Sequence, residues 1–154
     1  MMRWIAACML ALAGVCSMAV AQVPEMARFR VLCSRQGLPT TVVNALDRDR
    51  AGFVWVATND GLARYDGHGF RVWRHAAADP RSLSGNTVQT VHVDARDRVW
   101  TSSEFGGIDM LDTRREGFRH WRSADYPQLQ NDDIFAFASH GDRLWIGTGG
   151  GGLY

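Results

Sequence analysis

The sequence predicts an all-β protein built from repeated units of four antiparallel strands, and three observations predict it. Tryptophan recurs every 45 residues, at Trp55, Trp100 and Trp145, each time within a short aliphatic run. Clusters of Asp and Gly separate such runs, as expected of strands joined by tight turns. Hydrophobic residues make up 46% of the 154 residues and charged residues 21%, a composition that argues against a disordered chain.

The first unit contains four predicted strands, at residues 42–46, 53–58, 62–65 and 70–74. Asp and Gly stand between the first and second strands and between the third and fourth, where they tolerate the positive φ angles of tight hairpins. The second strand is apolar almost throughout, which is typical of a strand covered on both faces. The fourth alternates less regularly, as expected of an outer edge strand.

The same pattern continues in repeats at about residues 37–81, 82–127 and 128–154. An aromatic–arginine strand closes the first two units, and an earlier copy at 29–32 precedes them. The third repeat lacks one residue ahead of Trp145. A period in the low to mid forties with four strands per unit is typical of a β-propeller blade. An immunoglobulin-like sandwich also has short strands, but it does not predict this repeat.

The repeat resembles the two-component regulator propeller repeat. The residues that carry the resemblance are Gly37-Leu38-Pro39, the segments 53–58 and 60–67, and Ile146-Gly147-Thr148. The second unit departs from it, with Thr101-Ser102-Ser103 at the last of these positions and one inserted residue before Gly107. The resemblance covers about residues 29–154. It implies the periplasmic ligand-sensing region of a bacterial hybrid sensor histidine kinase or diguanylate cyclase.

The resemblance also implies an architecture larger than these repeats. In that family the blades close into rings, usually sevenfold, ahead of a transmembrane segment and a cytoplasmic output domain. We therefore expect about three repeats of an incomplete seven-bladed ring, in the N-terminal part of a longer receptor whose missing blades and output domain are partners of this region. A natural short protein is the alternative, and it would need to oligomerise to cover its sheet faces.

The first 21 residues have the features of a secretory signal peptide. Arg3 precedes an uncharged apolar run that ends with Ala19 and Ala21, small residues two positions apart. Cleavage before Gln22 predicts a periplasmic protein, with the parent receptor anchored in the inner membrane. An uncleaved membrane anchor is the alternative. Once residues 1–21 are removed, Cys33 is the single cysteine, so no intrachain disulfide can form.

The balance of charge excludes two classes of partner. Beyond residue 21 the chain carries 16 Arg and no Lys against 16 Asp and Glu. Nucleic acids and anionic membrane surfaces both require a basic excess. We expect instead a small-molecule or oligosaccharide ligand, and contact with a membrane only through the parent chain.

Binding residues are expected in the loops at one end of the blades. Strand direction places the loops between the second and third strands at the same end as the connections between units, and loops on a rigid scaffold commonly carry binding residues. The predicted ligand contacts are Asn59, Asp60, Glu104 and Phe105. For Asn59 and Asp60 the simpler interpretation, an Asx-type turn ahead of Gly61, is favoured over ligand contact. The three repeat tryptophans are predicted to be equivalent core residues.

The sequence predicts neither a cofactor, a metal site nor an enzyme. The pair Asp47 and Asp49 resembles a calcium loop only faintly, and it does not repeat in the second unit, which has His92 and Asp94 at the matching positions. The five His lack zinc-ligand spacing. No nucleophile or phosphate-loop motif is present. The predicted function is therefore extracytoplasmic ligand sensing, and the alternative is part of a secreted propeller lyase, glycosidase or carbohydrate-binding scaffold.

Overall fold

The computed structural model describes residues 28–154, of which residues 31–154 form one compact unit. The predicted leader at residues 1–21 lies outside the described residues. Residues 28–33 have no regular secondary structure, and the first element is the 3-10 turn η1 (Ser34–Gln36). The strand expected at 29–32 is therefore not formed: Phe29 is 92% and Val31 81% exposed. An isolated fourth strand has no neighbour with which to hydrogen bond.

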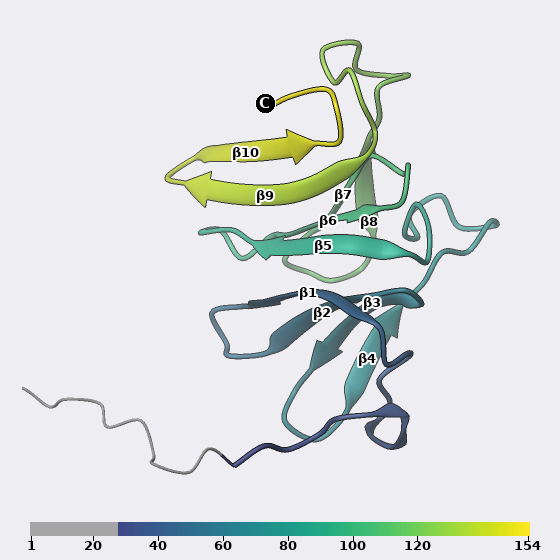
Figure 1. Ribbon diagram of the computed structural model, residues 1–154, viewed down its shortest axis with the longest axis vertical. Helices are drawn as coiled ribbons and strands as arrows, with labels where there is room; N and C mark the ends of the chain where they lie inside the picture. Colours follow the sequence, from purple (N-terminus) through teal and green to yellow (C-terminus); the bar gives the residue numbers. More distant parts are fainter. Residues whose placement is uncertain (1–27) are drawn as a thin grey trace, which may run out of the picture. The chain divides into compact units, whose positions relative to one another are not determined.

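The described unit is made of antiparallel sheets in which strands adjacent in sequence are adjacent in space (Figure 1). The first sheet consists of β1 (Val43–Arg48), β2 (Val54–Thr58), β3 (Gly61–Tyr65) and β4 (Phe70–Trp73). The second consists of β5 (Val88–Val93), β6 (Val99–Ser103), β7 (Ile108–Leu111) and β8 (Phe118–Trp121). The strands β9 (Ile134–His140) and β10 (Arg143–Thr148) pair in a third sheet. These sheets are β-propeller blades, and the strand order confirms the predicted fold class.

The turn between the first two strands of each blade explains the spacing of the repeats. In the first blade Asp49 donates its N–H to the Phe53 carbonyl and accepts the N–H of Gly52, both at 3.0 Å. The equivalent turn between β9 and β10 is shorter, because His140 pairs directly with Arg143. The residue missing from the third repeat is thus lost from this hairpin. The faint calcium pattern at Asp47 and Asp49 belongs to the hairpin of the first blade.

Glycine is required where the third strand begins. Gly61 has φ +112°, and a Cβ there would lie 2.4 Å from the carbonyl oxygen of Trp73 at the end of β4. Gly107 occupies the same position in the second blade, with φ +72° and the carbonyl oxygen of Trp121 at 2.5 Å. Both the left-handed backbone and the close approach exclude a side chain. The repeated glycine is therefore fixed by geometry.

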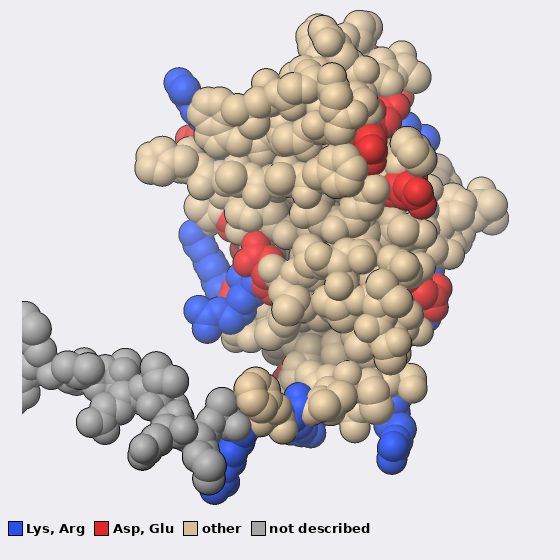
Figure 2. Space-filling view, in the orientation of Figure 1, with Lys and Arg blue, Asp and Glu red and all other residues tan. Residues whose placement is uncertain are grey.

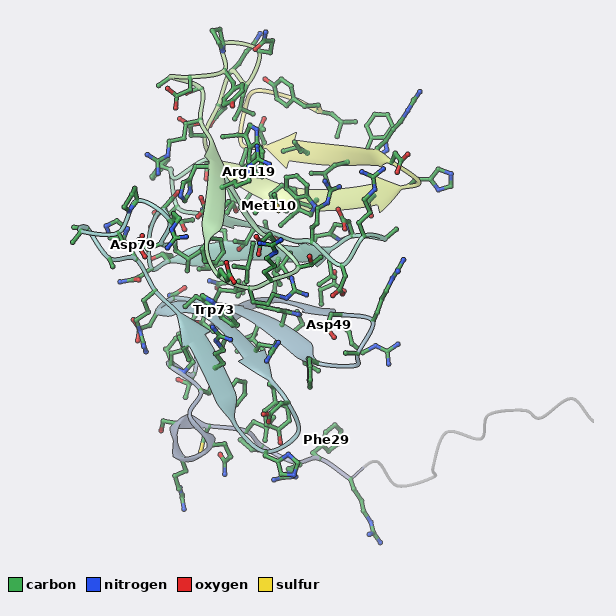
Figure 3. The ribbon with its side chains drawn as sticks, turned by 180° about the vertical axis from the view of Figure 1, so that it is seen from behind. Phe29, Asp49, Trp73, Asp79, Met110 and Arg119 are labelled. Carbon is green, nitrogen blue, oxygen red and sulfur yellow. The ribbon has the colours of Figure 1, made fainter. Side chains whose placement is uncertain are left out.

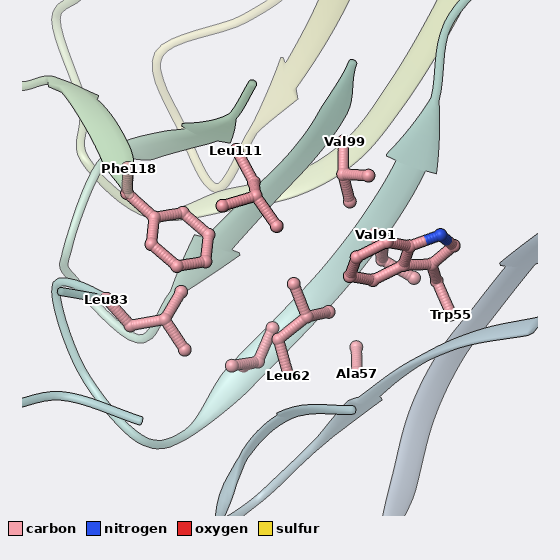
Figure 4. Packing of buried hydrophobic residues seen from close by; sticks show 9 residues of the cluster. Trp55, Ala57, Leu62, Leu83, Val91, Val99, Leu111 and Phe118 are labelled. Carbon is pink, nitrogen blue, oxygen red and sulfur yellow. The ribbon is translucent and has the colours of Figure 1, made fainter. Parts of the chain in front are cut away.

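The core lies between the faces of successive sheets. Trp55, Ala57 and Leu62 of the first sheet face Val99 and Leu111 of the second, and all five are fully buried (Figure 4). On the other face of the second sheet, Trp100 packs with residues of β9 and β10 in a second cluster. Successive side chains of a strand point to opposite faces of its sheet. In the second sheet, Val99 and Leu111 therefore pack against the first blade and Trp100 packs against the third.

A buried aspartate caps the tryptophan of each of the first two blades. The indole Nε1 of Trp55 donates to Asp49 Oδ2 at 3.0 Å, and that of Trp100 donates to Asp94 Oδ2 at 2.8 Å. Asp49 lies in the turn between β1 and β2 (Figure 3). The cap satisfies an indole N–H that burial would otherwise leave without a partner.

Trp145 departs from the equivalence expected of the three tryptophans. Trp55 and Trp100 are 0% and 9% exposed, whereas Trp145 is 42% exposed. It occupies the same place in the second strand of its sheet, but its side chain is on the face of β10 that no further described sheet covers. Burial of the repeated tryptophan is a property of the interface with the following blade and not of the strand position alone.

Candidate functional site

The first strands of the three sheets, β1, β5 and β9, are here called the inner strands. They lie side by side, and each contains a β-bulge at the same position. β5 contacts both β1 and β9. The register of each inner strand slips by one residue near its start, and the extra residues are Asn44, Gln89 and Phe135. A bulge leaves one residue out of the ladder and re-aims its side chain, which is why bulges are common beside binding sites.

The three bulge residues line one pocket of about 440 Å³. That volume is within the range of small-molecule sites. The pocket is built from the starts of the inner strands and from the turns between the second and third strands. Its lining residues are Val43, Asn44, Asn59, Thr87, Gln89, Glu104 and Phe135.

The pocket gathers positions that differ between repeats. The bulge position holds Asn, Gln and Phe in the three blades, and the first turn residue after the second strand holds Asn59, Glu104 and Gly149. By contrast, the positions of the repeated tryptophan and of the glycine that opens the third strand do not change. Binding residues commonly lie at variable surface positions on a rigid repeated scaffold, so the residues at these positions are candidates for ligand contact.

Two amide side chains link neighbouring blades at the pocket. The Nδ2 group of Asn44 donates to Asn59 Oδ1 and to the carbonyl oxygen of Val88, both at 2.8 Å. Gln89 donates Nε2 to Asp133 Oδ1 at 3.2 Å. Its Oε1 is buried and accepts no hydrogen bond from any residue in 28–154. A residue that lines the pocket therefore carries a buried acceptor without a donor, which is unusual in a folded protein.

Glu104 and Phe135 contribute charge and an aromatic face. The backbone N–H of Glu104 donates to the Thr87 carbonyl at 2.9 Å, which holds its turn against the start of β5. Phe135 is 58% exposed. Gly149 lies beneath it, since a Cβ at Gly149 would come within 2.5 Å of Phe135 Cε2. The absence of a side chain at Gly149 thus leaves room for the phenyl ring.

Of the four predicted contact residues, two line this pocket. Asn59 and Glu104 do so, while Asp60 and Phe105 are not among its lining residues. Asp60 forms a two-point contact with Arg74, whose Nη2 lies 3.0 Å and Nε 3.2 Å from its carboxylate oxygens. The hydrogen bond from Arg74 lowers the pKa of Asp60. Phe105 is 73% exposed and has φ +52° in the enlarged turn of the second blade.

The turn at Asn59 and Asp60 is held by Thr58 and not by an Asx contact. The hydroxyl of Thr58 accepts the Asp60 N–H at 3.1 Å and donates to the Gly61 carbonyl at 2.7 Å. This leaves the Asn59 side chain free to bond Asn44. Ligand contact by Asn59 and Glu104 stays a prediction.

Asn44, Gln89 and Phe135 were not predicted from the sequence as contact residues. A regular strand would alternate through these positions, and a bulge has no residue signature of its own in these strands. The available signal was the difference between repeats at aligned positions that otherwise share a scaffold.

A second polar cavity, of about 320 Å³, lies at the connection into the second blade. Asp109 is fully buried and accepts hydrogen bonds from Ser84 Oγ at 2.5 Å and from His120 Nδ1 at 2.6 Å. His120 Nε2 lies 2.9 Å from the Pro80 carbonyl, and Arg122 donates to Ser84. The hydrogen bond to Asp109 raises the pKa of His120. These groups satisfy one another, so this cavity is less suited to an external ligand.

Within the described residues, no group of three or more His, Cys, Asp or Glu is placed to hold a metal ion. His120 is half-buried. No helix in residues 28–154 is long and apolar enough to cross a membrane.

Comparison with known proteins identifies the repeat. Residues 37–60 match the family model described as two component regulator propeller. A stretch of 56 residues is 36% identical to Histidine kinase P4 of Formosa agariphila; it covers 36% of this chain and 4% of that protein. The chain therefore spans a small part of the curated relative that it matches.

Solved structures show the same arrangement. The extracellular domain of the putative hybrid two component system BT3049 from B. thetaiotaomicron superposes with a TM-score of 0.70 at 25% identity, over 77% of this chain and 17% of that one. The extracellular domain of BT4673 from the same organism has a TM-score of 0.61 at 20% identity, over 84% of this chain and 18% of that one, and supports the fold alone. These likenesses support the β-propeller fold of the described residues, and residues 37–60 match the regulator propeller repeat.

Proposed function

We propose that this chain, whose residues 37–60 are a two-component regulator propeller repeat, is part of the extracytoplasmic ligand-sensing region of a bacterial signal-transduction receptor. The observation that carries the proposal is the regulator repeat together with the likeness to an extracellular domain of a hybrid two-component system. A sensor of the histidine kinase type is favoured over a diguanylate cyclase type, because the curated relative is a histidine kinase. The output domain would lie elsewhere in a longer protein.

The pocket at the inner strands supports a sensing role. Its lining comes from all three described blades, so a small-molecule or oligosaccharide ligand bound there would contact three sheets at once. A ligand that binds one arrangement of the blades better than another shifts the population toward that arrangement. The signal would then be a change in the packing of blades that the parent chain transmits to its output domain.

Export to the periplasm is part of this proposal, with the parent anchored in the inner membrane. Fusion of residues 1–154 to a phosphatase that is active only outside the cytoplasm tests export in a Gram-negative host. We expect phosphatase activity that is lost when residues 1–21 are deleted. Equal activity of both fusions would contradict the export signal.

The coding sequence downstream of residue 154 tests the receptor itself. We expect further propeller repeats, then an apolar run long enough to span a bilayer, then a kinase or cyclase domain. A stop codon after a few more repeats, with no membrane span, would contradict the receptor and favour a secreted propeller enzyme or carbohydrate-binding scaffold.

A further inference from the structure

We propose that the pocket at the inner strands recognises an ammonium group, carried by an aliphatic amine or by an amino sugar. This inference rests on the proposed function, because it narrows the ligand of the same sensing pocket. It is drawn from the charge of the pocket, from its exposed aromatic ring and from its free hydrogen-bond acceptors.

The pocket carries negative charge without a basic counterpart. Glu104 lines it, and Asp133 is bonded to the lining residue Gln89. None of the seven lining residues is basic, and neither carboxylate forms an ion pair with any residue in 28–154. Acidic side chains gather at the right-hand ends of the inner strands in Figure 2, over the region where β9 begins. A cationic ligand would supply the missing positive charge.

The aromatic ring lies beside one of these carboxylates. A Cβ at Gly149 would lie 2.5 Å from Phe135 Cε2 and 2.8 Å from Asp133 Oδ2, so ring and carboxylate flank the same small residue. Phe135 is 58% exposed and therefore presents apolar surface to the pocket. A cation held at a carboxylate and over an aromatic ring gains from both the charge and the ring quadrupole.

The amides of the pocket offer oxygen acceptors. Asn44 donates both hydrogens of its Nδ2 group, to Asn59 and to Val88, so its Oδ1 is the part that remains for a ligand. Gln89 donates to Asp133, and its own Oε1, although buried, accepts no hydrogen bond from residues 28–154. An ammonium group has three donors and no acceptor, which suits a site composed of carboxylate and amide oxygens.

Ligand-observed NMR titration of the purified chain tests the inference with two matched pairs of probes. Putrescine is compared with butane-1,4-diol, and D-glucosamine with D-glucose, so that each pair differs by amine against hydroxyl. We expect binding of at least one amine and a binding constant at least about tenfold weaker for its neutral partner. The pair that responds distinguishes an aliphatic amine from an amino sugar.

Single substitutions locate the binding. Glu104→Gln and Asp133→Asn should each weaken amine binding by about tenfold, since each removes one charge with little change in shape. Phe135→Leu should weaken it by about two- to fivefold, which is the range for an exposed cation–π contact. Glu116→Gln, which neutralises an exposed glutamate in the turn between β7 and β8, is the matched control and should leave binding unchanged.

Three results would overturn the inference: no binding of either amine, equal binding within both pairs, or insensitivity of amine binding to Glu104→Gln. Equal binding of glucosamine and glucose would mean that the pocket reads sugar hydroxyls. None of these results bears on the proposed receptor function, which is tested separately by the phosphatase fusion and by the downstream coding sequence.

Discussion

Replacement of Asp94 by Asn tests the capping aspartate with almost no change in volume. Asp94 Oδ1 accepts the backbone N–H groups of Arg96 and Arg98 at 2.9 and 3.0 Å. Its Oδ2 accepts Trp100 Nε1 at 2.8 Å and Arg98 Nε at 2.6 Å. An asparagine that keeps the Oδ1 contacts places an NH₂ group against these two donors. Because Asp94 is only 7% exposed, water cannot replace both lost bonds.

The expected loss in the free energy of unfolding is about 2–3 kcal/mol. A hydrogen bond to a charged group contributes about 1.5–3 kcal/mol, and the contact from Arg98 adds less because that side chain is 31% exposed. Urea unfolding followed by tryptophan fluorescence measures the change. Asp142→Asn is the control: that carboxylate pairs with Arg96 on the surface and is 79% exposed, so its loss should cost under about 1 kcal/mol. Equal destabilisation by the two variants would refute the capping role.

The charge of Asp94 adds a pH dependence to the same contact. Burial raises the pKa of this carboxyl, but the hydrogen bonds from Trp100, Arg98 and Arg96 together outweigh burial and lower it. The stability that the Asp94 carboxylate contributes should therefore be complete above pH 3.8, the ordinary pKa of an aspartate, and be lost as pH falls through the lowered pKa. The Asp94→Asn variant should lose less stability than the wild type over that acid range.

Three further predictions concern the core, the second polar cavity and the leader. Trp55→Ala should cost about 3–5 kcal/mol in urea melts, whereas Trp73→Ala should cost less; the reverse order would contradict the strand assignment. His120 faces two acceptors, Asp109 and a carbonyl, which favour its protonated form and raise its pKa above 6.5. The stability it contributes should be full below about pH 6.5 and fall as pH rises through the raised pKa, and His120→Gln should abolish this slope in melts at several pH values. Intact-mass measurement of the exported protein should show cleavage after residue 21; a mass that retains the N-terminal methionine would favour an anchor.

The sequence by itself determined the repeat and most of its strands. Hydrophobic periodicity, turn residues and the 45-residue spacing are local properties, so strands were predicted within one or two residues of β1 to β4. The glycine that opens each third strand was visible as a repeated residue, and the structure supplies its cause in the close carbonyl of β4 or β8. The family resemblance also rested on these local residues, and the match at 37–60 confirms it.

The tertiary structure decided which residues form the candidate site. Asn44, Gln89 and Phe135 reach the pocket because each inner strand bulges where it meets the turn of its own blade and the neighbouring sheet, and no single strand encodes that meeting. Asp60 does not line the pocket, and its carboxylate is bound by Arg74, fourteen residues away in the sequence. Trp145 is exposed although its local sequence matches that of Trp55, because burial of this side chain depends on contact with a following sheet. Hydrophobic periodicity and turn residues thus determine the strands of each blade. Packing between blades determines which side chains are buried and which residues line the pocket.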